Sequence, residues 1–507
     1  MTRAAAIVLV GATLALAGCA YPKNPQLDRV DSCTGYRFNN LTQNDPRNTD
    51  DTFIILTFSG GGTRAAALAY GVLEHLRQTP IDGGRKRLLD EVDVISSVSG
   101  GSFTAAYYGL FGEQQFFEKF KDAVLHRRIE TDLILRILAP WNWPRLLSPW
   151  FGRSDLADEY YDRNIFEGRT YAAMPLRRPF IILNATDISL GAQFSFTQDD
   201  FDRLCSNLSG VHVSRGVTAS SAFPVAFTPL TLKNYPKDAC HYTAPDWVGL
   251  ALRDFTVNPS RYNRAVTWRS YENAAHRPFI HLSDGGLADN IGLRGPEVAI
   301  NSDDPSWSLL RMVDKVKHLA VIAVDAKPED PTTLDRYARP PGIYSVLNAA
   351  ATNPMENYSS DTIELLRTGF KAWDTDACNF ARRQQKMSHS CDALAAEQCA
   401  HSHEHGCIER HRRECKAQFV PPESDRLPHP DLYRVHVQFA ALKDETLRQR
   451  LEQIPTALQL STEDVELLIN AAGTLLEQSD DYRRLRYDLG GESTPGDPAL
   501  RPRCPLE

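Results

Sequence analysis

From residue 51 onward, apolar runs and glycine turns alternate along the chain in a pattern that predicts strands followed by helices. Residues 53–58 (FIILTF) form a nearly continuous apolar run, typical of a strand buried on both faces of a parallel sheet. The glycine turn SGGGTR follows, and after it Leu68, Val72 and Leu76 recur at helical spacing. This order of strand, turn and helix predicts the first βα unit of an α/β domain.

A second unit of the same kind follows directly. Residues 92–96 predict a short strand, SVSGGS a turn and FTAAYYGLFG a helix. Further apolar runs predict strands at residues 180–184, 279–282 and 318–325. Because strands that alternate with helices form layered domains, we expect an α/β domain with a mostly parallel central sheet over residues 51–370.

The sequence that follows this domain has a different composition. Residues 371–420 contain five cysteines and five histidines and form a Cys/His-rich insertion. Residues 421–507 are expected to be a helical C-terminal region. In the stretch STEDVELLINAAGTLLEQ, Ser461 is placed to cap a helix whose inner face carries Val465 and Leu468.

The first residues of the chain predict export and anchoring. The apolar run over residues 4–17 is too short for a membrane span and is typical of a secretory signal. The following Leu-Ala-Gly-Cys resembles a bacterial lipobox, which implies that residues 1–18 are a signal peptide and that Cys19 is lipidated. Since Ala20 follows, the resemblance implies an outer-membrane lipoprotein that faces the periplasm. A plain signal peptide cleaved nearby is the alternative.

Residues 19–50 are polar and rich in turn-forming residues, so we expect them to form a tether or an irregular arm. The whole chain carries a formal net charge of −8 and has a pI near 6.0. This balance favours neither a nucleic-acid partner nor an electrostatic attraction of the chain as a whole to anionic lipid.

Export would place the nine cysteines other than Cys19 in an oxidising compartment, where most should pair and at least one should remain unpaired. The sequence does not determine the pairing. Cys391, Cys399, Cys407 and Cys415 are eight residues apart, which suits two antiparallel helices joined by disulfides. The stretch HSHEHGC around these cysteines could instead bind zinc or copper, but we favour disulfides and assign no metal site.

The turn SSVSGGSF, residues 96–103, is a candidate nucleophile elbow, in which a serine stands on a sharp turn between a strand and a helix. The signature G-x-S-x-G fits best when it is centred on Ser99, with Ser97 in place of the first glycine. Centring on Ser97 would put Ile95 at a position that needs a small residue, and centring on Ser102 would put Thr104 there. A serine-rich turn without a catalytic role is the alternative.

The earlier glycine turn, formed by Gly60, Gly61 and Gly62 and followed by Arg64, lies between a strand and the start of a helix. Several backbone N–H groups can therefore point at one negatively charged group, and the helix dipole favours that charge. The turn could be an oxyanion hole or a phosphate cradle. It lacks the G-K-[ST] of a Walker loop, and the next strand ends in the serine elbow rather than in a ribose-binding acid.

The third candidate is Asp284, in the stretch HLSDGGLADN. It follows an apolar strand and precedes two glycines, so its carboxylate would also emerge at the end of a strand. An ordinary Asp-Gly turn is the alternative for this stretch alone.

In this order, the three blocks resemble the patatin-like phospholipase family, with its glycine-rich oxyanion loop, serine elbow and D-G-[GA] aspartate. Two further stretches fit, ILNATDISLGAQFSF (182–196) and TASSAFPVAFTPL (218–230). The departures from the family pattern are Ser59, Ala65 and Ser97, none of which removes a catalytic group.

The resemblance implies a three-layer α/β/α fold and a serine acyl hydrolase that acts on phospholipid or lysophospholipid esters without a cofactor. Ser99 would attack the ester carbonyl and form an acyl-enzyme, and Asp284 would take the serine proton directly. The resemblance assigns Gly60, Gly61, Gly62 and Arg64 to the oxyanion hole, where the loop amides would stabilise the oxyanion and Arg64 would brace the loop. An aspartate base needs a pKa raised by burial to work near neutral pH.

Two alternatives differ in their chemistry. A Ser-His-Asp esterase of the α/β-hydrolase type would need a histidine after the aspartate, and His318 and His389 have no motif context. His281 lies three residues before Asp284 on the same strand, so it should point to the opposite face of the sheet. A catalytically inactive, lipid-binding envelope lipoprotein is the non-enzyme alternative.

Residues 133–151 (LILRILAPWNWPRLLSPWF) hold three tryptophans among leucines and prolines. A packed helical hairpin is the ordinary interpretation of this segment. An interfacial lid is the sharper hypothesis, because amphipathic aromatic side chains suit a membrane surface.

Overall fold

The computed structural model describes residues 24–41, 46–301, 316–328, 335, 338–401, 405–418, 430–492, 497–500 and 504. No helix within these ranges is long and apolar enough to cross a membrane. The predicted signal peptide and Cys19 lie outside the described residues.

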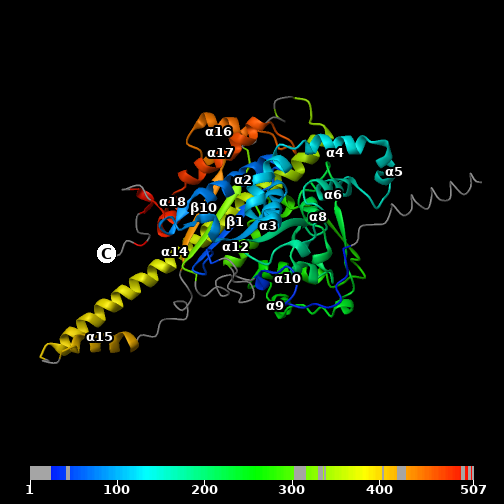
Figure 1. The fold of residues 1–507 in the computed structure, drawn as a ribbon. Coiled ribbons are helices and arrows are strands. Elements are labelled where there is room, and N and C mark those ends of the chain that lie inside the picture. The colour runs from blue at the N-terminus through cyan, green and yellow to red at the C-terminus, as the bar shows by residue number, and fades with distance from the viewer. Residues whose placement is uncertain are drawn as a thin grey trace, which may run out of the picture.

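A mixed, mostly parallel sheet of eight strands forms the centre of the molecule (Figure 1). Its strands run in the order β10-β9-β1-β4-β5-β8-β7, and β6 pairs with β5. All pairings from β10 to β5 are parallel, whereas β8, β7 and β6 join in antiparallel pairs. The bounds are β1 (Thr52–Phe58), β4 (Val92–Val98), β5 (Phe180–Asp187), β6 (Ala192–Ser195), β7 (Leu230–Lys233), β8 (Phe279–Asp284), β9 (His318–Asp325) and β10 (Asp431–Gln438).

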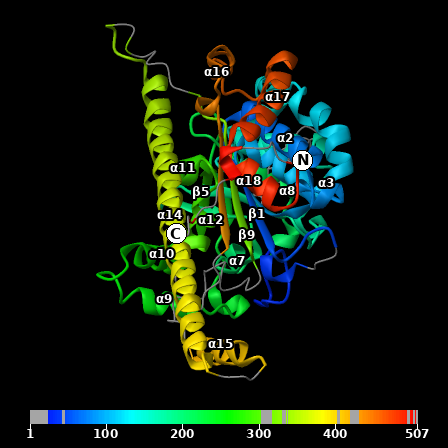
Figure 2. The same cartoon turned by 90° about the vertical axis from the view of Figure 1, so that its left-hand side faces the viewer.

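Helices cover both faces of the sheet and complete a three-layer α/β/α sandwich (Figure 2). One layer contains α2 (Gly62–Gln78), α3 (Gly100–Phe120) and α17 (Thr462–Gln478). The other contains α11 (Gly286–Asp289), α12 (Arg294–Asn301) and the long α14 (Ile343–Cys399). Since β1 and β4 are buried along their whole length, their continuous apolar character follows from their central place in the sheet. The predicted fold class is confirmed.

The C-terminal region contributes more than helices to the fold. It was expected to be helical and does contain α16 (Glu445–Glu452), α17 and α18 (Asp480–Asp488). It also provides β10, the edge strand that pairs with β9. In β10, Leu432, Tyr433, Val435 and Val437 are buried, so this region is part of the same core as the first βα units.

The described part of the N-terminal arm is packed on the domain, so of the two expectations for residues 19–50 the irregular arm fits and the tether does not. Tyr36 is buried and stacks on Phe180 at the start of β5. The Arg37 guanidinium, also buried, pairs with Asp199 and Asp202. An aromatic ring and a doubly paired arginine give this irregular segment a fixed place on the surface of the sheet.

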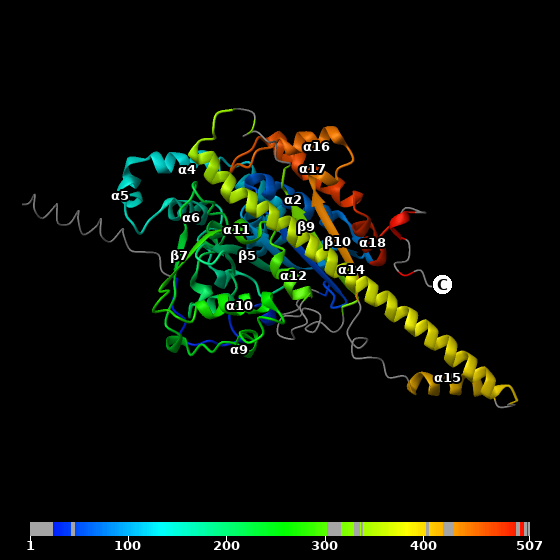
Figure 3. The ribbon, with the colours of Figure 1, turned by 180° about the vertical axis from the view of Figure 1, so that it is seen from behind.

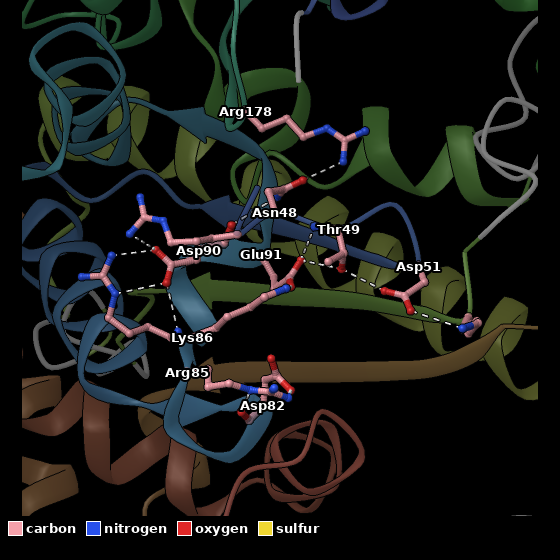
Figure 4. Close-up of polar contacts among 12 residues, drawn as sticks. Asn48, Thr49, Asp51, Asp82, Arg85, Lys86, Asp90, Glu91 and Arg178 are labelled. Carbon is pink, nitrogen blue, oxygen red and sulfur yellow. Dashed lines mark hydrogen bonds and ion pairs between the residues drawn. The ribbon is translucent and has the colours of Figure 1, made fainter. Parts of the chain in front are cut away.

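The last part of the arm is held at the start of β4 (Figure 4). The N–H and hydroxyl of Thr49 both donate to the Glu91 carboxylate, at 2.8 and 2.9 Å. Asn48 donates to the carbonyl of Asp90 and accepts from Arg178. These bonds fix the chain where it enters β1.

Four disulfides pair eight cysteines: Cys205–Cys240, Cys378–Cys504, Cys391–Cys415 and Cys399–Cys407. The last two join α14 to α15 (Cys407–Gln418), so the prediction of two helices joined by disulfides is confirmed. Cys33 is unpaired and exposed.

The Cys/His-rich insertion also brings together the side chains of Cys399, Cys407 and His411. Because the sulfurs of Cys399 and Cys407 are bonded to one another, they are not available as thiolate ligands for a metal ion. His401 and His405 of the suggested metal stretch lie among described residues, whereas residues 402–404 lie outside them.

Candidate active site

Ser99 stands alone in the sharp turn between β4, which ends at Val98, and α3, which begins at Gly100. Its φ of 48° and ψ of −118° are strained for a residue other than glycine, as expected of a nucleophile elbow. The glycines that follow are required by close packing. A Cβ at Gly100 would overlap the backbone of Gly62, and one at Gly101 would lie 2.6 Å from the Cβ of Phe58.

The other serines of the turn are buried and have partners of their own. Ser96 donates to the carbonyl of Gly292 and Ser97 to that of Ile182. Ser102 bonds to the hydroxyl of Ser97. Only Ser99 in this stretch is partly exposed, which is the condition that a nucleophile must meet.

Asp284 is the last residue of β8, and its carboxyl group forms a hydrogen bond with the Ser99 side chain. The N–H of Gly286 donates to Oδ1 of Asp284 at 2.8 Å. Burial raises the pKa of Asp284 from 3.8 to about 6, although both hydrogen bonds act to lower it. A carboxyl group with this pKa is ionised near neutral pH and can still accept a proton there.

The glycine loop lies directly against the elbow. Gly61 and Gly62 have φ values of 136° and 60°, which side chains of L-residues rarely allow. A Cβ at Gly62 would overlap the carbonyl oxygen of Ala457. Within the described residues, no backbone hydrogen bond uses the N–H of Gly61 or Gly62, so neither amide is committed to a backbone acceptor there.

Gly60 was predicted to belong to the oxyanion hole, but its N–H is not free to bind an oxyanion. Its N–H already donates to the carbonyl of Asn290 at 2.9 Å. A Cβ at Gly60 would overlap the Asn290 side chain and lie 3.3 Å from the Cβ of Ser99. Gly60 therefore allows close approach but does not supply a free donor.

Arg64 was also assigned to the oxyanion hole, but its side chain points elsewhere. The buried guanidinium donates to the carbonyls of Ala326, at 2.8 Å, and Ile454, at 2.6 Å. Burial lowers its pKa to about 10, which leaves the side chain charged at neutral pH. Arg64 thus braces the loop, as expected of its second role, and is a positioning residue.

Three other residues complete the site. Ser220, in the stretch 218–230 singled out by its sequence, accepts the N–H of Ser99 at 2.9 Å and donates to the carbonyl of Asn184 at 2.6 Å. Met355 of α14 lies beside Gly286, and Ala457 accepts the N–H of Thr63. No motif marks Met355 or Ala457, because both arrive from segments far along the chain.

The three histidines weighed for a triad lie away from this constellation. His318 is the first residue of β9. Because β9, β1 and β4 are parallel, His318 lies at the amino ends of these strands, whereas Ser99 follows the carboxyl end of β4. His281 is exposed and its Nδ1 bonds to the hydroxyl of Thr231 at 2.8 Å. His389 is in the distal half of α14.

The chain also matches a model of a known protein family. The family model described as patatin-like phospholipase matches residues 56–296. The matched range begins within β1, ends within α12 and contains the glycine loop, the elbow and Asp284. No curated protein shows a significant match to the chain.

Proposed function

Residues 56–296 form a patatin-like phospholipase domain, and we propose that it cleaves acyl esters of phospholipids or lysophospholipids through a Ser99–Asp284 dyad. One observation carries the proposal: the strained, partly exposed Ser99 is hydrogen-bonded to a buried aspartate whose pKa is raised to about 6. A serine with a base in contact and free amides nearby is the minimum that acyl transfer requires.

In the first half of the reaction, Oγ of Ser99 forms a bond to the ester carbonyl carbon while its proton moves to the Asp284 carboxylate. The carbonyl oxygen becomes an oxyanion, which the N–H groups of Gly61 and Gly62 would stabilise. The bond from carbon to the alcohol oxygen then breaks, and Asp284 returns the proton to the leaving alcohol. The product is an acyl-enzyme on Ser99.

In the second half, Asp284 takes a proton from water while the water oxygen attacks the acyl carbon. The bond to Oγ of Ser99 breaks, the proton returns to the serine and the fatty acid leaves. The same carboxyl group acts as base and acid in each half, so a pKa near 6 is well matched to neutral pH. The placement of His281, His318 and His389 away from Ser99 supports a dyad over a triad.

We also propose that Cys19 is lipidated and holds the protein at the outer membrane, on the periplasmic side. The lipobox-like sequence and the four disulfides support this location. Cys19→Ser should abolish lipidation. Intact mass spectrometry of the N-terminus and membrane fractionation measure this, and an unlipidated wild-type N-terminus would contradict it.

Fatty-acid release from a panel of phospholipids and lysophospholipids tests the activity. Ser99→Ala should reduce release to background and abolish labelling by a fluorophosphonate, while Ser97→Ala should retain both because Ser97 is buried in β4. Circular dichroism serves as the folding control. A labelled peptide that carries Ser97, or full activity of Ser99→Ala, would refute the assignment of the nucleophile.

A further inference from the structure

Residues 129–152, which we call the tryptophan segment, present large apolar side chains to solvent. The segment contains α4 (Ile129–Leu138), a short 3-10 turn (Pro140–Asn142) and α5 (Trp143–Leu146). Trp141 is 78% exposed, Trp143 53% and Leu147 84%. The expectation of a packed hairpin is therefore wrong for these side chains, although the segment is helical.

The exposed side chains are concentrated in one short stretch of the sequence. Of the twenty-four large hydrophobic residues that are exposed in the described chain, seven lie in this segment: Ile134, Leu135, Leu138, Trp141, Trp143, Leu147 and Trp150. Single exposed apolar residues are ordinary, but a contiguous group of this kind marks an interaction surface.

The tryptophan segment is held firmly to the domain. The Arg145 guanidinium pairs with Glu159 and lies 3.9 Å from the centre of the Phe151 ring. Asp132 accepts a hydrogen bond from the hydroxyl of Tyr160, outside the segment, at 2.6 Å, and Asn142 donates within the segment to the carbonyl of Arg136 at 2.8 Å. The apolar side chains are thus displayed on a scaffold with its own polar contacts, and Figures 1 and 3 show α4 and α5 standing at one end of the molecule.

The segment carries no net charge, whereas the whole chain carries −8. Glu130 and Asp132 lie at its start and offset Arg136 and Arg145, and no acidic residue lies between Asp132 and Asp155. Exposed tryptophan and leucine side chains without a surplus of negative charge suit the headgroup region of a bilayer, where the indole ring presents an apolar body and a polar N–H.

The N-terminal arm leads to the same side of the molecule. Asn24 is fixed to β7, because its Oδ1 accepts the N–H of Lys233 at 2.6 Å and its Nδ2 donates to Ser206 at 2.7 Å. Cys19 is five residues earlier, so a lipid there lies within about 18 Å of Asn24. β7 is only about 10 Å long, and its Leu230 end is the one nearer to the tryptophan segment. Figure 3 shows β7, α4 and α5 along this side.

One short loop connects this surface with the active site. Thr228 and Pro229 line a cavity of about 420 Å³ together with Trp150 and Phe151. Six residues before Thr228, the carbonyl of Ala222 accepts the N–H of Asp284 at 3.0 Å. The loop from Ala222 to Pro229 therefore connects the surface of the tryptophan segment with Asp284.

We propose that the tryptophan segment docks the protein on a bilayer surface, and that this contact delivers lipid substrate to the site. The occupant is a bilayer, because exposed interfacial aromatic residues stand on the side where the N-terminal arm would place the lipid anchor. The delivery of substrate rests on the proposed function, whereas the docking itself does not.

The test uses the chain from Ala20 onward, which has no lipid and keeps every described residue. The combined variant Trp141→Ala, Trp143→Ala and Leu147→Ala is compared with a matched control, Leu250→Ala, Phe255→Ala and Val257→Ala. The control removes similarly exposed apolar side chains around α9 (Asp246–Ala251). Binding is measured by co-sedimentation with vesicles of phosphatidylethanolamine and phosphatidylglycerol, in a Ser99→Ala background so that turnover does not alter the lipid.

The tryptophan-segment variant should bind these vesicles at least about tenfold more weakly and hydrolyse vesicle phospholipid correspondingly more slowly. Its turnover of a monomeric short-chain ester should stay unchanged, and the control variant should match the wild type throughout. Unchanged vesicle binding would overturn the proposal, as would a wild-type dimer that these substitutions make monomeric while binding stays intact. Wild-type protein that binds vesicles but hydrolyses neither substrate would refute the proposed function and leave the docking supported.

Discussion

Replacing Asp284 by asparagine should abolish turnover and at the same time stabilise the protein at neutral pH. Burial raises the pKa of Asp284 from 3.8 to about 6. A carboxyl group that holds its proton more tightly in the folded state stabilises the fold at low pH. It loses that contribution as the pH rises through the two pKa values. Above pH 6 the ionised, buried carboxylate therefore costs stability that asparagine would not cost.

The size of the gain follows from the shift. A difference of about two pKa units corresponds to about 3 kcal/mol at most, since each unit is worth about 1.4 kcal/mol. For a chain of 507 residues, the entropy of unfolding makes this about 1 °C in Tm per kcal/mol. We therefore expect Asp284→Asn to raise Tm by up to about 3 °C above pH 6, and to have little effect below pH 3.8.

The assay is differential scanning fluorimetry of wild type and Asp284→Asn in buffers that span this interval, with disulfides intact. Asp238→Asn is the matched control, because Asp238 is an exposed carboxylate on the same domain. Its Tm difference from wild type should not follow the same course with pH. A Tm of Asp284→Asn below that of wild type near pH 8, or a gain that is equal at every pH, would refute the reasoning.

Three further outcomes follow from the site. The logarithm of kcat/KM should rise up to about pH 6 and then level off, because Asp284 must be ionised to act as base; a pH–rate profile measures this, and a flat profile through pH 6 would contradict it. Gly62→Ala should lower both Tm and kcat, since its φ is 60° and its Cβ would overlap Ala457, and wild-type values of either would contradict it. Arg64→Met should cost about 2–4 kcal/mol of stability, by chemical denaturation, because two buried carbonyls lose their donor. It should also lower kcat more than KM, and an unchanged kcat would remove its positioning role.

The sequence predicts those parts of the fold in which the apolar pattern of a segment directly reflects its burial in the sheet. The strand at residues 318–325 is found with the predicted bounds, as β9, because its apolar run reflects burial on both faces. Ser99 and Asp284 could be selected as candidates because a strand and glycines flank each of them. The sequence did not indicate that β8 runs antiparallel to β5, so that Asp284 pairs with Ala185, next to Asn184, the partner of Val98. The helix predicted after the elbow ends at Gly112, where α3 is interrupted by a φ of 76° and a ψ of 172° before a second helical stretch continues to Phe120.

The parts that the sequence did not predict depend on contacts between distant segments. The place of β10 beside β9 depends on a partner that lies about a hundred residues earlier in the chain, which an apolar pattern does not identify. The N-terminal arm is polar, but its docking depends on Tyr36 and on the pairing of Arg37. The N–H of Gly60 is occupied by Asn290, whose carbonyl arrives from the segment after β8. Which glycine amide stays free is decided by that distant contact.

The disulfide between Cys378 and Cys504 makes the C-terminal quarter of the protein a covalently closed ring. The two cysteines are 126 residues apart, and β10 and α17 lie between them. Closing a loop of this length removes unfolded-state entropy worth about 5 kcal/mol. A protease that cuts once inside the ring would not release the edge strand from the sheet. The cut protein would migrate as one species on a gel without reductant and as two fragments after reduction.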